Sequence, residues 1–130
     1  MLIRLDMASD VPIYLQLRNQ VVLGIGAGKL KVGDSLPTVR QLAEDTGVNV
    51  MTVTKAYTLL KNQGFLEIDR RHGAKVCRAP AADGDFYQRL EDELSLLIAE
   101  SRARGLDRDA FLAVCARLYE SLNSRGGTER

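Results

Sequence analysis

A chain of 130 residues, 45% hydrophobic and 27% charged, has the composition of a globular protein of one domain with a small appendage. Its longest apolar run, residues 21–25, contains Gly24 and falls far short of the ~20 residues that a bilayer requires, and no secretory signal is recognisable. We therefore expect a cytoplasmic protein without a membrane span.

The formal net charge of +1 conceals an asymmetry between the two parts of the chain. Residues 1–80 hold 11 Lys and Arg against 7 Asp and Glu, whereas residues 81–130 hold 7 against 10. A basic segment favours contact with phosphate, because each phosphate that it neutralises releases condensed counterions. The N-terminal part is therefore the part expected to meet nucleic acid.

The first predicted element is an amphipathic helix that begins near Pro12. Proline suits a first-turn position, and apolar residues then recur at every fourth place, at Ile13, Leu17, Val21 and Ile25. Glycines end this helix, and residues 29–37 are predicted to form a loop that includes a short strand.

A short second helix is predicted to begin at Val39. Thr38 can cap it, and Gln41 stands three residues after Thr38, which is the spacing of a capping box. Gly47 can adopt the left-handed backbone conformation that ends a helix.

A third helix is predicted to follow, with Asn49 as its N-cap. Its buried stripe comprises Val53, Ala56, Tyr57 and Leu60. The remaining surface carries hydroxyls, one cation and a thioether but no carboxylate, at Met51, Thr52, Thr54, Lys55 and Thr58. Two short helices joined by a glycine-containing turn present the second helix to DNA, and this surface would not repel phosphate.

A two-stranded hairpin is predicted after the third helix. Residues 65–69 and 74–78 alternate apolar and polar side chains, which places Leu66, Ile68, Ala74 and Val76 on comparable faces. The connection Arg70-Arg71-His72-Gly73 gives the hairpin a basic tip. Helix, helix-turn-helix and hairpin is the order of a winged-helix domain.

A flexible linker at residues 80–84 divides the chain into a winged helix-turn-helix domain, 1–79, and a helical segment, 80–130. The predicted fold class is α+β, mostly α, with a two-helix C-terminal dimerisation segment. Two helices cannot cover both of their apolar stripes alone, so we expect a homodimer. Its contact residues would be Phe86, Leu90, Leu94, Leu97, Ile98, Phe111, Cys115, Leu118, Tyr119 and Leu122.

Three segments together resemble bacterial GntR-type transcriptional regulators, particularly the short YtrA-like branch: PIYLQLRNQV, GKLKVGDSLPTVRQLAEDTGVNVMTVTKAYTLLKNQGFLEI and RRHGAKV. The resemblance covers about residues 12–78. It implies a dimeric winged-helix repressor or activator that binds double-stranded DNA, with control of neighbouring transporter genes. It also implies a short helical dimerisation segment in place of a ligand-binding domain.

The DNA contacts expected from the motif and from the exposed helix surface come from the first helix-turn-helix element, the recognition helix and the wing. They are Ser35, Thr38, Arg40, Asn49, Val50, Met51, Thr52, Thr54, Lys55, Arg71, His72 and Gly73.

Two positions depart from the pattern that the resemblance implies. Many members carry a polar residue or Arg at the place of Val50, and Arg at the place of Thr54, so arginine readout of guanine is not expected from these positions. Contact of Val50 or Met51 with thymine methyl groups is the substitute that we hypothesise. The same departures motivate an alternative, a winged-helix protein-interaction module without specific DNA binding.

No residue set indicates an enzyme, a cofactor or a metal site. His72 is the single histidine and lacks further ligands at metal-binding spacing, and neither a phosphate-binding glycine loop nor a nucleophile elbow is present. Cys77 and Cys115 lack CxxC spacing and are expected to stay as thiols. A small-molecule effector is left open but is not indicated.

Overall fold

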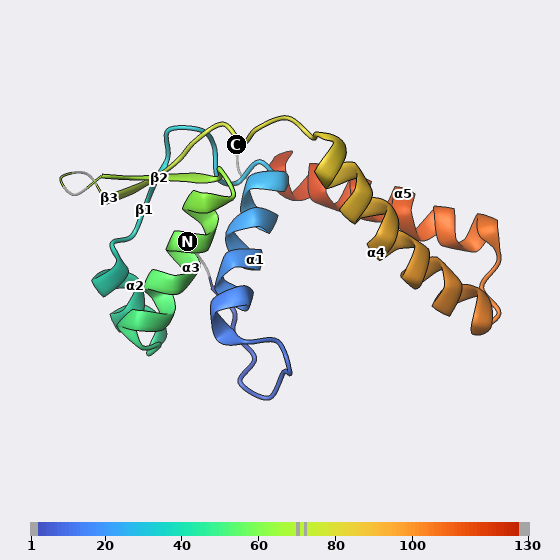
Figure 1. Cartoon of the computed structure of the whole chain (residues 1–130), viewed down its shortest axis with the longest axis horizontal. Coiled ribbons are helices and arrows are strands. Elements are labelled where there is room, and N and C mark those ends of the chain that lie inside the picture. The colour runs from blue at the N-terminus through green and yellow to red at the C-terminus, as the bar shows by residue number, and fades with distance from the viewer. Residues whose placement is uncertain (1–2, 70, 72, 128–130) are drawn as a thin grey trace.

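The computed structural model describes residues 3–69, 71 and 73–127, with only the backbone described for 124–127. Its elements, in chain order, are α1 (Ile13–Gly26), β1 (Ser35–Leu36), α2 (Val39–Thr46), α3 (Val50–Asn62), β2 (Leu66–Asp69), β3 (Gly73–Val76), α4 (Gly84–Ala103) and α5 (Arg108–Gly127) (Figure 1). The α+β, mostly α, winged helix-turn-helix fold is confirmed. Among the described helices, none combines the length and the apolar character needed to cross a bilayer.

The hydrophobic core lies where α1 packs along α3 and where α2 and the sheet close over them. The most deeply buried large side chains are Leu17 and Val21 from α1 and Val53 and Leu60 from α3. Both pairs belong to the apolar stripes predicted from the sequence, and burying such stripes is the main source of stability for helices of this length. Ile13 and Ile25, at the two ends of the α1 stripe, are only half-buried.

The three strands form an antiparallel sheet in the order β1-β3-β2. Leu66 pairs with Val76 and Ile68 with Ala74, so the four residues share the face that the alternation predicted. Burial follows the prediction at three of them, but Ile68 is 43% exposed. Ile68 lies on β2, an edge strand, whereas its cross-strand partner Ala74 lies on the central strand β3 and is buried.

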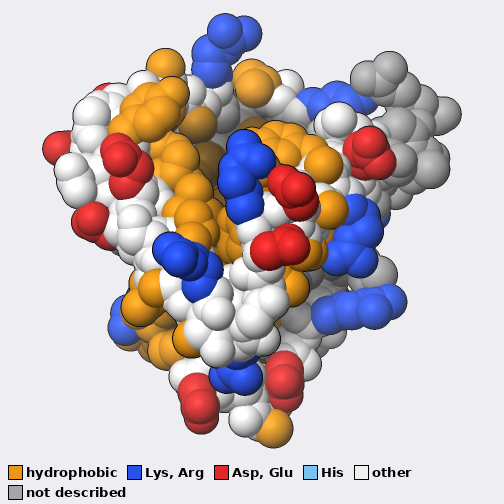
Figure 2. Space-filling model, turned by 90° about the vertical axis from the view of Figure 1, so that its right-hand side faces the viewer, with side chains coloured by type: hydrophobic (Ala, Val, Ile, Leu, Met, Phe, Trp, Pro, Cys, Tyr) orange, Lys and Arg blue, Asp and Glu red, His pale blue; other side chains and the backbone are white. Residues whose placement is uncertain are grey.

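The last two helices form an antiparallel hairpin that projects from the winged domain, here called the helical arm (residues 84–127; Figure 1). Asp83 caps α4 through the N–H of Phe86, and Gly105, with φ 87°, makes the turn before α5. None of the residues of α4 is buried, and Leu97 on α4 and Leu118 on α5 are each 54% exposed. Figure 2 looks onto this end of the molecule and shows hydrophobic side chains exposed in a band flanked by charged ones.

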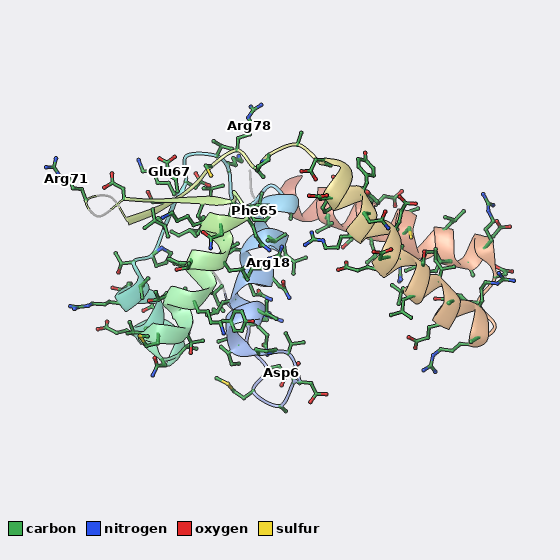
Figure 3. All side chains as sticks on the ribbon, in the orientation of Figure 1. Asp6, Arg18, Phe65, Glu67, Arg71 and Arg78 are labelled. Atoms are coloured by element: carbon green, nitrogen blue, oxygen red, sulfur yellow. The ribbon has the colours of Figure 1, made fainter. Side chains whose placement is uncertain are left out.

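Arg18 marks the place where α1 approaches the arm. Its Nε donates a hydrogen bond of 2.9 Å to Oε1 of Gln63, and its guanidinium lies 5.8 Å from the centre of the Phe65 ring (Figure 3). Burial lowers the pKa of Arg18, and the positive charge of Arg89 on α4 lowers it further, while Glu93 raises it. The base of α4 is therefore close enough to α1 for their charges to interact.

Candidate nucleic-acid interface

The first helix of the helix-turn-helix begins and ends as its sequence predicts. The Oγ1 of Thr38 accepts a hydrogen bond of 3.1 Å from the N–H of Gln41, and Gly47 ends the helix with φ 74°. The capping box is only half formed, because the Gln41 side chain donates to Asp45, one turn later, at 2.8 Å. The cap fixes the turn in which Arg40 stands exposed.

The recognition helix α3 turns an acid-free surface outward. Oδ1 of Asn49 accepts a hydrogen bond of 2.7 Å from the N–H of Met51, which confirms Asn49 as the N-cap. The predicted stripe is buried against the core, and the other side of the helix faces outward. On that side Met51 is 75% exposed and Val50 is 45% exposed. Thr54 and Lys55 are also exposed, and Thr52 is half-buried. No residue from Val50 to Asn62 is acidic.

Tyr57 locks α3 to the segment that leads into α2. Its ring is buried, as predicted, and its hydroxyl donates a hydrogen bond of 2.7 Å to the carbonyl oxygen of Pro37. Burial raises the pKa of this phenol to about 12. The hydroxyl is therefore occupied within the protein, and it holds the Pro37–Thr38 backbone, and with it the start of α2, against the recognition helix.

The wing is the β2–β3 hairpin. Gly73 opens β3 with φ 74°, a left-handed conformation that disfavours a side chain, and the N–H of Arg71 donates to Oδ1 of Asp69 at 2.8 Å. The Arg71 side chain is exposed at the far end of the wing, whereas Arg78 points away from the other end of the sheet (Figure 3). The predicted role of His72 lies outside the described residues.

The predicted DNA contacts come together on one side of the winged domain. The start of α2, the first half of α3 and the β2–β3 wing all lie on the side opposite the arm (Figure 1). Ser35 is also exposed, in register with Lys75 of β3. Cations and hydroxyl groups arranged in this way can contact phosphates, while exposed side chains at the start of α3 can reach base edges.

One contact at this surface has no signal in the sequence. The Nζ of Lys55 lies 4.0 Å from the centre of the Tyr14 ring, so the lysine leans toward α1 across the surface of α3. Tyr14 follows Ile13 in an amphipathic helix, and helical periodicity gives it no distinct role. The described part of the chain holds no group of three His, Cys, Asp or Glu residues that could bind a metal ion.

Comparison with known proteins relates this geometry to a family of regulators. Residues 13–76 match the family described as bacterial regulatory proteins, gntR family. The chain is 40% identical over 106 residues to the HTH-type transcriptional regulator Rv1152 of Mycobacterium tuberculosis, covering 82% of this chain and 84% of that protein. It is 31% identical over 109 residues to the HTH-type transcriptional repressor YtrA of Bacillus subtilis, covering 82% and 83%.

A solved structure shares both the fold and part of the sequence. YtrA from Sulfolobus acidocaldarius, a GntR-family transcription factor, is 34% identical, with a TM-score of 0.60. The likeness covers 78% of this chain and 97% of that one, so it extends beyond the residues of the family match.

Proposed function

Because the chain belongs to the gntR family of bacterial regulatory proteins and is a YtrA-like transcriptional regulator, we propose that it binds a specific DNA operator as a homodimer. The observation that carries this proposal is that the start of α2, where Arg40 is exposed, the acid-free helix α3 and the wing lie on one side of the domain. In this arrangement α3 enters the major groove, and the wing, with Arg71, His72 and Gly73, lies against the neighbouring backbone and minor groove.

The dimer in this proposal forms through the helical arm. The exposed apolar band on the arm comprises residues that a soluble monomer would leave in water, and a second copy of the chain is the occupant proposed for it. Residues 1–79 then act as the DNA-binding unit and residues 80–130 as the dimerisation unit. A two-fold axis between two recognition helices requires a near-palindromic operator, with half-sites about one helical turn or a multiple apart.

Base reading in this proposal relies on apolar contacts. Val50 and Met51 are both exposed at the start of α3, and neither can donate a hydrogen bond to guanine. Contact with the C5-methyl group of thymine is the readout that such side chains supply. We therefore expect thymine to be selected under the first turn of the recognition helix.

The direction of regulation is proposed to be repression. The Bacillus subtilis relative is named a transcriptional repressor, and a regulator bound over a promoter acts most simply by excluding polymerase. The YtrA-like resemblance also implies control of neighbouring transporter genes. The protein would act on this DNA in the cytoplasm.

Selection of binding sites from randomised duplexes tests the proposal. The purified protein is expected to enrich a near-palindromic site that carries thymines in both half-sites, and gel-shift titration should show preference for that site over scrambled DNA. Substitution of Val50 or Met51 should relax the thymine preference. Enrichment of no sequence would overturn sequence-specific binding and favour the alternative interaction module.

A further inference from the structure

We propose that Tyr14 and Lys55 together form a phosphate clamp on the DNA backbone, at the edge of the groove that α3 enters. This inference rests on the proposed DNA binding and extends the interface from the helix-turn-helix to α1. It assigns a contact to Tyr14, and it makes Lys55 a backbone contact and not a reader of bases.

The clamp lies at a hollow between α1 and the outward surface of α3. Its polar lining consists of a phenol, an ammonium, three hydroxyls and an amide, from Tyr14, Lys55, Thr52, Thr54, Thr58 and Asn62. Met51 and Leu59 complete the lining, and no carboxylate contributes to it. Much of the lining is apolar, but its polar groups are one cation, several hydroxyl donors and an amide, with no acid, so they suit an anion rather than a cation.

The two residues of the clamp retain their hydrogen-bonding capacity. Within the described residues, neither the Tyr14 hydroxyl nor the Lys55 ammonium makes a hydrogen bond or an ion pair. The ring of Tyr14 lies 4.0 Å from Nζ of Lys55 and holds the ammonium by a cation–π contact, which limits the sweep of a long exposed side chain. The donors that remain can bind phosphate oxygens.

The position of the hollow identifies the anion as backbone phosphate. Met51, Thr52 and Thr54 line the hollow, and the same residues belong to the half of α3 proposed to enter the major groove. When the first half of α3 lies in the major groove, the sugar-phosphate backbone of one DNA strand passes along the flank of α3 that faces α1. Tyr14 and Lys55 meet that strand, while Arg40 and the wing contact DNA from other elements.

Salt-dependent DNA binding separates the two contacts. A cation that neutralises one phosphate contributes about 0.9 to the slope of log K against log salt, so Lys55→Met should lower the slope by about two in a dimer and weaken binding roughly tenfold. A neutral hydroxyl releases no counterion. Tyr14→Phe should therefore weaken binding roughly two- to tenfold with the slope unchanged.

The positioning effect of the ring is tested with Tyr14→Leu. This variant should weaken binding more than Tyr14→Phe while Lys55 is present, because the ammonium loses its support. In a Lys55→Met background the two Tyr14 variants should bind alike. A general effect of Tyr14 on folding would make Tyr14→Leu equally harmful in both backgrounds, and thermal unfolding of each variant checks the fold directly.

The experiment uses the full chain and fluorescence anisotropy with the selected operator duplex at several KCl concentrations. Lys61→Met is the matched control, because Lys61 is an exposed lysine of α3 outside the hollow, and its slope should equal that of the wild type. If Lys55→Met and Lys61→Met give the same affinity and slope, or if Tyr14→Phe binds as tightly as the wild type, the clamp is overturned while the DNA-binding proposal stands. Failure of the wild type itself to bind would overturn both.

Discussion

At the scale of single residues, the interface depends on side chains that the backbone holds out from the core. Arg40 illustrates this, because Thr38 caps the helix two residues before it and the core residue Leu42 follows two residues after it. The arginine is thereby fixed at the exposed start of α2. Its guanidinium can donate to two acceptors at once, which suits either a phosphate or a base edge.

Arg40→Ala is expected to weaken operator binding without affecting assembly. Loss of the arginine contact should cost about 1–3 kcal/mol in each half-site, which is roughly a five- to 150-fold loss of affinity per half-site. Anisotropy titration measures the affinity, and sedimentation measures the oligomeric state. Arg78→Ala is the control, since Arg78 is also exposed but points away from the end of the sheet opposite the wing tip. Equal affinity of the two variants would refute the role proposed for Arg40.

Tyr57 gives the protein a pH-dependent contribution to stability. Its pKa in the folded state is raised to about 12 from an ordinary value of 10.0, so the folded protein holds the phenol proton more tightly than the unfolded chain does. The contribution is fully present below pH 10 and is lost as the pH rises from 10 toward 12. Tyr57→Phe should cost about 1–3 kcal/mol at pH 8, because the Pro37 carbonyl loses its donor.

The measurement is urea unfolding of the wild type and Tyr57→Phe at pH 8 and at steps above pH 10. The difference in unfolding free energy should shrink across the alkaline steps, because only the wild type carries this phenol. Tyr87→Phe, which removes an exposed hydroxyl from the arm, should match the wild type at pH 8. A difference that stays constant up to pH 12 would contradict the linkage.

At the scale of elements, the turn between α2 and α3 depends on backbone conformation more than on space. A Cβ added at Gly47 would meet nothing within 4 Å, yet the φ of 74° is one that L side chains rarely adopt. Gly26, the last residue of α1, also has open space around it but lacks the positive φ. The two glycines therefore separate conformational strain from steric exclusion.

Alanine at these two positions should change stability in opposite directions. Gly47→Ala should destabilise the protein by about 1–2 kcal/mol, since it forces a side chain into the left-handed region. Gly26→Ala should stabilise it by up to ~1 kcal/mol, because alanine loses less backbone entropy in a helix. Thermal or urea unfolding measures both. Equal shifts of the same sign would show that φ does not control the turn.

The elements that could be predicted from sequence are those with local signals. Thr38 and Asn49 are caps that bond to backbone within three residues, and Gly47 ends its helix through its own φ, so each is visible in a short window of sequence. The buried stripe of α3 follows from helical periodicity in the same way. The caps, the terminating glycine and the helical periodicity are therefore enough to predict the helix-turn-helix from sequence.

The features that could not be predicted arise between distant residues. The Lys55–Tyr14 contact joins α3 to α1, and the two residues are 41 positions apart in the chain. Ile68 fits the alternation of a buried strand but is exposed, because its strand β2 lies at the edge of the sheet. The stripe of α3 predicts that Tyr57 is buried, as it is, but the partner of its hydroxyl, Pro37, depends on how the segment after β1 meets α3. Periodicity predicts which face of a helix or strand a residue lies on, but it does not predict which distant residue packs against that face.

At the scale of the whole molecule, the arm presents an apolar surface that the chain itself does not cover. Phe111, Cys115 and Leu122 are half-buried, while Leu97, Leu118 and other members of the predicted dimer stripe remain exposed. Part of the apolar surface of the arm is therefore already covered within the chain. A second hairpin would cover the rest, and it would set the separation of the two recognition helices.

Leu97→Asp should dissociate the proposed dimer, because it places a charge within the apolar stripe of α4. Sedimentation should show monomers at concentrations where the wild type is dimeric, and operator affinity should fall at least tenfold because one half-site no longer assists the other. Leu96→Asp is a closely matched control: Leu96 is the neighbouring leucine, 75% exposed, and lies outside the stripe. If both variants dimerise like the wild type, or if Leu96→Asp is the more disruptive, the copies associate through a different surface and the spacing of the half-sites must have another origin.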